Sequence, residues 1–196
     1  MKKLLLAVAL PEETVPVELP GWESVTCITG ISKPYSAARL SRAVAAHHPD
    51  AVLNIGSAGT LRHAVGDIFV CRRFVDRDIA RQEFDSISPE VHCGTTAPFP
   101  ERPTLINGKP VQGLFTCNTG EDFVTAADRV DGDVIDMEAF AEALVCKEFS
   151  IPFVAVKYVT DVVGQNSMQI WEERLSGARA ALRDYFRQHL GEDRSF

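Results

Sequence analysis

One short stretch of this chain changes from strand-like to helix-like composition with no loop between the two. Residues 134–135 are β-branched, as is typical of a buried strand, whereas residues 139–145 are rich in alanine and have apolar residues at helical spacing. A strand that leads directly into a helix is the building unit of α/β folds. Asp136, Met137 and Glu138 stand at the junction, so two carboxylates lie where the strand ends and the helix begins.

The rest of the chain repeats this alternation. Further strands are expected at 4–10, 24–29, 51–55, 66–75, 111–117 and 151–160, and further helices at 35–48 and 168–190. Residues 76–103 are polar and contain prolines, which predicts a long excursion or lid, and Thr125 is expected to cap a short helix. We therefore predict one domain, residues 1–196, with a three-layer α/β fold: a mixed, mostly parallel sheet flanked by helices.

Composition narrows the class of partner. The net charge is −7 and no basic run occurs, so a nucleic-acid partner is not expected. No apolar stretch is long enough to span a membrane. Residues 1–10 imitate a signal peptide, but the apolar run is short and Pro11 follows at once, so we expect a first strand in a cytoplasmic protein.

The five cysteines are scattered and contain no CxxC pair, which favours reduced, buried thiols. The histidines form no spaced ligand set either. We therefore expect neither a metal nor a cofactor, and a small molecule as the partner.

Residues 56–59, with the sequence Gly-Ser-Ala-Gly, are expected to form a corner where the backbone can approach a ligand closely. A dinucleotide fingerprint would require a helix directly after the corner, but a strand pattern follows instead, and the spacing does not match a P-loop. The corner is therefore not a phosphate cradle of either kind.

Acidic residues follow three of the expected strands. They are Glu13, Glu138 and Asp161, and Ser57 follows a fourth strand. Each acid taken alone is equally consistent with a helix cap or a solvated loop residue. Because the carboxyl ends of strands in one sheet open onto one cleft, these side chains are expected to meet. Paired carboxyls suit general acid–base hydrolysis through an oxocarbenium-like state.

Four segments together resemble the purine nucleoside phosphorylase and nucleosidase superfamily, and within it the methylthioadenosine/S-adenosylhomocysteine nucleosidases. The segments are Ala7–Glu13, Val52–Gly59 with Val65–Ile68, Val134–Glu138, and Pro152–Asp161. They occur in the order of the family and run through most of the chain. The resemblance implies a nucleoside phosphorylase-like fold and hydrolysis of a purine N-glycosidic bond by water, without a cofactor.

The resemblance also implies roles for individual residues. Asp161 would be the acid that protonates purine N7, and this requires a carboxyl that is neutral at pH 7, with a pKa raised by burial or by a nearby carboxylate. Glu13 would be the base that orients water, although Glu12 beside it leaves the register open. Glu138 would bind the ribose hydroxyls, and Met137 would pack on the sugar.

The remaining implied positions surround the base and the water. Phe123 would stack on the base and the Val124 backbone would read its edge, while Ser57 would lie near the water and Gly59 would line the substrate site. The resemblance further implies a homodimer. Asp136, by contrast, is interpreted as structural.

The chain departs from the family pattern at several points. Lys157 stands where the family usually has arginine, Thr160 where it has serine, and Phe140 where a small residue is usual. The segment after the first strand is also shorter. These differences concern the 5′ substituent and the base more than the core reaction.

Three alternatives stay open. A futalosine-type hydrolase would differ only in its substrate. A nucleoside phosphorylase would need an anion cradle where Leu10–Glu13 places carboxylates, and Arg39, Arg72 and Arg73 are interpreted as surface charges. A non-catalytic nucleoside-binding homologue belongs to another functional class.

Overall fold

The computed structural model describes residues 1–82, 86–94, 102–122, 124, 131–163 and 167–190. Its strands are β1 Lys2–Val8, β2 Trp22–Ile28, β3 Ala51–Thr60, β4 Ile68–Asp76, β5 Glu90–His92, β6 Thr104–Ile106, β7 Lys109–Val111, β8 Phe115–Thr119, β9 Val134–Asp136 and β10 Phe153–Val162. Its helices are η1 (a 3₁₀ turn) Pro11–Glu13, α1 Lys33–His47, α2 Arg77–Ala80, α3 Ala139–Glu148 and α4 Ser167–Leu190.

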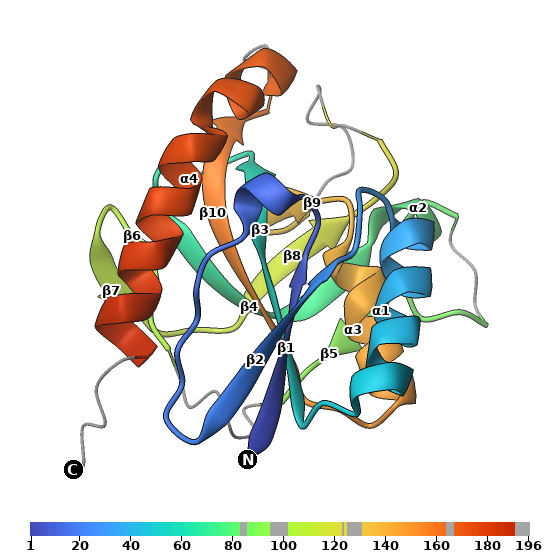
Figure 1. Cartoon of the computed structure of the whole chain (residues 1–196). Helices are drawn as coiled ribbons and strands as arrows, with labels where there is room; N and C mark the ends of the chain where they lie inside the picture. Colours follow the sequence, from blue (N-terminus) through green and yellow to red (C-terminus); the bar gives the residue numbers. More distant parts are fainter. Residues whose placement is uncertain (83–85, 95–101, 123, 125–130, 164–166, 191–196) are drawn as a thin grey trace.

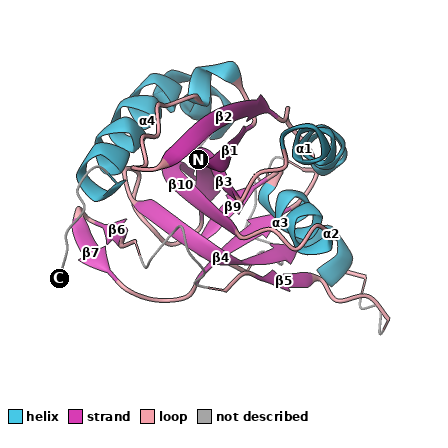
Figure 2. Ribbon diagram, turned by 60° about the horizontal axis from the view of Figure 1, so that its bottom comes forward, coloured by secondary structure: helices cyan, strands magenta, loops and turns pink. Residues whose placement is uncertain are grey.

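The strands form one mixed sheet. β1 pairs in parallel with β2 and β3, and β3 pairs in parallel with β10. From β10 the pairing passes to β4, β8 and β9 and returns to β3, so these five strands close a ring from which β1 and β2 extend (Figure 2). The mixed sheet was predicted, whereas the closed ring was not.

Helices cover the sheet on two sides, as predicted (Figure 1). In β1, Leu5 and Ala7 join the core cluster that contains side chains of α1 and α3, whereas Leu4, Leu6 and Val8 join the cluster under α4. Side chains of a strand point alternately to opposite faces. A strand that is apolar on both faces is therefore buried between two layers of helix.

The predicted glycine corner at residues 56–59 is wrong, because β3 continues through it to Thr60. Gly56 pairs with Lys157 of β10, and the pairing continues beyond it to Thr60 and Val162. The main-chain hydrogen bonds to β10 hold these small residues extended, although their own strand propensity is low. The predicted excursion at 76–103 contains α2 and β5 in its described part. Thr125 lies outside the described residues.

All five cysteines are free. Cys71, Cys117 and Cys146 are buried, as predicted, whereas Cys27 and Cys93 are only half-buried. Within the part of the chain that the structure describes, no helix is both long and apolar enough to cross a membrane.

Candidate active site

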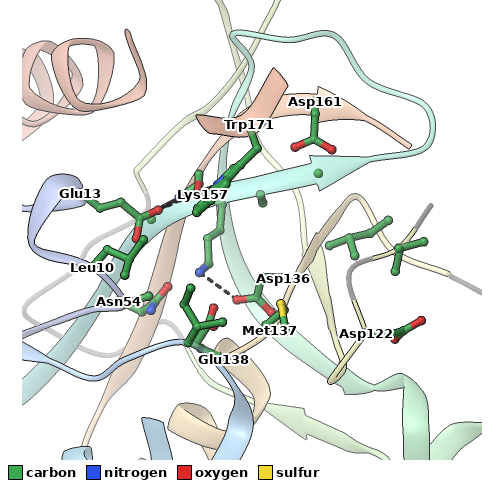
Figure 3. A pocket seen from close by; sticks show the side chains of 18 of the residues that line it. Leu10, Glu13, Asn54, Asp122, Asp136, Met137, Glu138, Lys157, Asp161 and Trp171 are labelled. Carbon is green, nitrogen blue, oxygen red and sulfur yellow. Dashed lines mark hydrogen bonds and ion pairs between the residues drawn. The ribbon is translucent and has the colours of Figure 1, made fainter. Parts of the chain in front are cut away.

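A cavity of about 370 Å³ opens where β1, β3, β9 and β10 end (Figure 3). It is lined by seven of the eight predicted site residues, namely Glu13, Ser57, Gly59, Val124, Met137, Glu138 and Asp161. The eighth, Phe123, lies outside the described residues. The sheet thus brings together side chains that are separated by more than a hundred positions in the sequence.

Glu13 is held by β3. Leu10 leaves β1 in an extended conformation and Pro11 starts η1, whose last residue, Glu13, is 5% exposed. Its Oε1 accepts hydrogen bonds from the Ser57 amide (2.8 Å) and the Ser57 hydroxyl (2.6 Å). Gly56 lies beside the same oxygen, and a Cβ there would be 3.4 Å from it, an ordinary van der Waals distance.

Asp161 is placed by an irregularity in β10. The register against β3 shifts between Val159 and Asp161, so Thr160 is an extra residue, and such bulges re-aim side chains. The Thr160 hydroxyl donates to Asp161 Oδ1 (2.9 Å). A Cβ on Gly59 would lie 3.1 Å from Asp161 Oδ2, so a larger residue there would require the carboxyl to move by a few tenths of an ångström.

Glu138 faces the cavity and does not cap α3. Its Oε1 accepts from the Ser32 amide (3.0 Å), whereas the α3 amide of Ala139 donates to Asp136 Oδ2 (3.0 Å). The capping role considered for Glu138 therefore belongs to Asp136, which is consistent with the structural role predicted for Asp136. Burial, followed by the nearby Asp136 carboxylate, raises the pKa of Glu138 to about 8.

Lys157 and Asp136 form a buried ion pair at the floor of the cavity, 2.8 Å from Nζ to Oδ2 (Figure 3). Burial would lower the pKa of Lys157, but the Asp136 carboxylate raises it above its ordinary value. Burial would likewise raise the pKa of Asp136, but the ammonium holds it below its ordinary range. Both members of the pair are therefore ionised, and the Lys157 ammonium lies in the same cavity as the Glu13, Glu138 and Asp161 carboxyls.

A second polar pair lies beside the first. Asn54, which lines the cavity, donates from Nδ2 to Oε2 of the fully buried Glu142 (2.8 Å). Burial raises the pKa of Glu142 to about 7. Asn54 Oδ1 and Glu142 Oε1 are buried without a hydrogen-bond partner in the described protein. Protonation of Glu142 would supply one donor to this group of acceptors.

The arginine interpretations are partly wrong. Arg72 is 8% exposed and donates to the Gly94 carbonyl (3.1 Å), so it is not a surface charge. Arg73 is half-buried and pairs with Glu90. Arg77, which no sequence pattern singled out, is 1% exposed and lines the cavity. Its guanidinium is engaged by Asp122 (2.9 Å) and by main-chain carbonyls.

Trp171 is a further site residue that the sequence pattern missed. It lines the cavity from α4, and its Nε1 donates to Ser57 Oγ (2.8 Å). A tryptophan on an amphipathic helix is ordinarily assigned to the core. Nothing in the sequence distinguishes Trp171 from a core residue, because its approach to the cavity depends on the path of the chain between Asp161 and α4.

Comparison with known proteins assigns the family. The model of the phosphorylase superfamily matches residues 12–186, which is most of the chain. This chain belongs to the phosphorylase superfamily. The resemblance noted in the sequence is thereby confirmed at the level of the superfamily.

Relatives within the phosphorylase superfamily narrow the comparison. The 5′-methylthioadenosine/S-adenosylhomocysteine nucleosidase of Bacillus subtilis is 28% identical over 180 residues, which cover 82% of this chain and 78% of that protein. The solved nucleosidase of the same name from Helicobacter pylori has a TM-score of 0.77 at 15% identity, covering 96% and 97% of the two chains. The futalosine hydrolase of Helicobacter pylori has a TM-score of 0.75 at 14% identity, covering 95% and 96%. These structures establish the shared fold.

Proposed function

We propose that this chain is a nucleosidase that hydrolyses the N-glycosidic bond of a purine nucleoside of the methylthioadenosine or adenosylhomocysteine type. Glu13 orients a water molecule and takes its proton as the water oxygen bonds to the anomeric carbon. Asp161 donates a proton to purine N7 as the bond from the anomeric carbon to N9 breaks, so the base leaves neutral. Glu138 binds the ribose hydroxyls and Met137 packs on the sugar.

The remaining site residues are assigned to the base and to the support of the two catalytic carboxyls. Phe123 and the Val124 backbone contact the base. Ser57 orients Glu13 through two hydrogen bonds, and Gly59 leaves room for the Asp161 carboxyl. The curated nucleosidase relatives support this assignment of reaction, and the cavity supports the roles of the seven assigned residues that line it.

The charges of the cavity favour water over phosphate as the nucleophile. Among the described lining residues the only cations are Arg77 and Lys157, and each is paired, with Asp122 and Asp136 respectively. Glu13 occupies the loop after β1, where its carboxylate would repel a phosphate dianion. The observation on which the proposal depends is a carboxylate held at the cavity while both cations among its described lining residues are already paired.

The test is a product assay. The protein is incubated with methylthioadenosine, adenosylhomocysteine, futalosine or inosine, with and without phosphate, and the released base and sugar are identified. We expect adenine from the first two substrates without phosphate. A sugar 1-phosphate that forms only when phosphate is present would overturn hydrolysis, and release from futalosine alone would reassign the substrate.

A variant ties the activity to the site. Asp161→Asn is expected to lower kcat at least about 100-fold through loss of the acid, with an unchanged circular dichroism spectrum. Asp131→Asn, which changes an exposed carboxyl outside the cavity, is the matched control. An Asp161→Asn variant with full activity on methylthioadenosine would remove Asp161 from the mechanism.

The proposal extends to organisation and location. We take residues 1–196 as one domain, supported by the contribution of β1, β3 and β10 to both main core clusters. We take the assembly as a homodimer, as the resemblance implies, and sedimentation velocity would measure it directly. The five free thiols support a reducing, cytoplasmic compartment.

A further inference from the structure

Three side chains from three different elements form a hydrogen-bonded chain along one wall of the cavity. Trp171 of α4 donates from Nε1 to Ser57 Oγ (2.8 Å), and Ser57 of β3 donates from Oγ to Oε1 of Glu13 (2.6 Å), which ends η1. Figure 3 shows Glu13 and Trp171 on the same side of the cavity. The contact links the C-terminal helix to the residue that we assign as the base.

The direction of this chain is determined by its first member. An indole nitrogen can only donate a hydrogen bond, so Ser57 Oγ must accept from it. The single hydroxyl proton of Ser57 is then available to the Glu13 carboxylate, which can only accept when it is ionised. The indole therefore selects the one hydroxyl rotamer that serves an ionised base.

The contacts with Ser57 make the two carboxylate oxygens of Glu13 different from each other. The Ser57 amide (2.8 Å) and hydroxyl both end on Oε1. Neither of these two donors engages Oε2, which is the oxygen that we assign to take the proton of water. A rotated hydroxyl would loosen this arrangement, because only the amide donor would still orient the carboxylate.

We infer that Trp171 is a positioning residue for Glu13, acting through the Ser57 hydroxyl. This inference deepens the proposed function and rests on it. A tryptophan that only filled the wall of the cavity would need its ring but not its N–H group. The two roles therefore separate in Trp171→Phe, which keeps an aromatic ring and removes the donor.

Steady-state kinetics with methylthioadenosine test the inference in a double-mutant cycle of Trp171→Phe and Ser57→Ala. We expect Trp171→Phe to lower kcat about three- to tenfold, the effect of one lost hydrogen bond, while KM changes less than about twofold because a ring remains. Ser57→Ala is expected to lower kcat by at least as much, and the double variant should equal Ser57→Ala. Trp22→Phe makes the same substitution on β2, outside the cavity, and should have wild-type kinetics.

Equal losses from Trp171→Phe in the wild-type and Ser57→Ala backgrounds would overturn the inference, as would a change confined to KM. A second measurement does not depend on turnover. In a Trp22→Phe background, the one remaining indole N–H gives a single NMR signal, which should shift when Ser57 is replaced by alanine. An unmoved signal rejects the Trp171–Ser57 contact even if the nucleosidase assay succeeds. A shifted signal in a protein that releases no base keeps the contact and rejects the proposed function.

Discussion

Lys157 and Asp136 meet as an ion pair with side chains that are 2% and 1% exposed, and their nearest charged atoms are 2.8 Å apart. The pair lies at the floor of the cavity, and Lys157 is the residue for which the sequence resemblance led us to expect an arginine. Each charge is compensated mainly by the other, and the Asp136 carboxylate also accepts hydrogen bonds from the Thr119 hydroxyl (2.6 Å) and the Ala139 amide (3.0 Å). Loss of one partner would leave an isolated charge in the interior.

The first prediction concerns this pair. Lys157→Met should lower the free energy of unfolding by about 3–5 kcal/mol, since it leaves Asp136 charged and buried. Combining it with Asp136→Asn should recover much of the loss. Urea denaturation measures both. Asp184→Asn, which breaks the half-exposed pair with Arg183, is the control and should cost less than about 1 kcal/mol. Equal costs for the buried and surface pairs would contradict the prediction.

The second prediction concerns pH. Burial raises the pKa of Glu142 to about 7 and that of Glu138 to about 8, so the folded state binds more protons than the unfolded state above pH 4.5. Stability should therefore fall as pH rises from about 5 to 8. Glu142→Gln should remove up to about 3 kcal/mol of that decline. Glu148→Gln, an exposed position of the same helix, should leave the slope unchanged.

Thermal unfolding across this pH range gives the measurement. A stability that rises steadily toward pH 8, or a Glu142→Gln variant with the wild-type slope, would show that Glu142 is already ionised in the folded protein.

The third prediction concerns the backbone at Ser32. Its φ of 94° and ψ of 152° lie in a region that is favourable only for glycine, and its amide is held by Glu138 (3.0 Å). Ser32→Gly should stabilise the protein by about 1 kcal/mol because it removes this strain. Ser41→Gly, inside α1, should instead destabilise by about 0.5 kcal/mol. A loss of stability at both positions would argue against strain at Ser32.

The fourth prediction separates two adjacent acids. Glu13 lines the cavity and is buried against Ser57, whereas Glu12 is exposed, and we therefore propose Glu13 as the base. Glu13→Gln should lower kcat on methylthioadenosine at least about 100-fold, and Glu12→Gln should keep wild-type activity within about twofold. A similar loss of kcat in both variants would contradict the assignment of Glu13 as the base.

The sequence predicted the elements of this fold better than their limits. The apolar run at 4–10 and the junction at 134–145 are local patterns, and both appear as β1 and as β9 followed by α3. The extension of β3 through Gly56 could not be predicted, because small residues carry no strand preference of their own. They are extended because β10, a hundred residues later, supplies the hydrogen bonds.

The candidate site divides in the same way. The sequence by itself determined which carboxyls follow the strands, and the rule that strand ends share a cleft was enough to bring Glu13, Glu138 and Asp161 together. Only the tertiary structure decided what holds them. Trp171 reaches Ser57 from α4, and Lys157 neutralises Asp136 within the interior. Hydrogen bonds and ion pairs depend on distances between atoms, and a linear pattern does not contain those distances until the chain is folded.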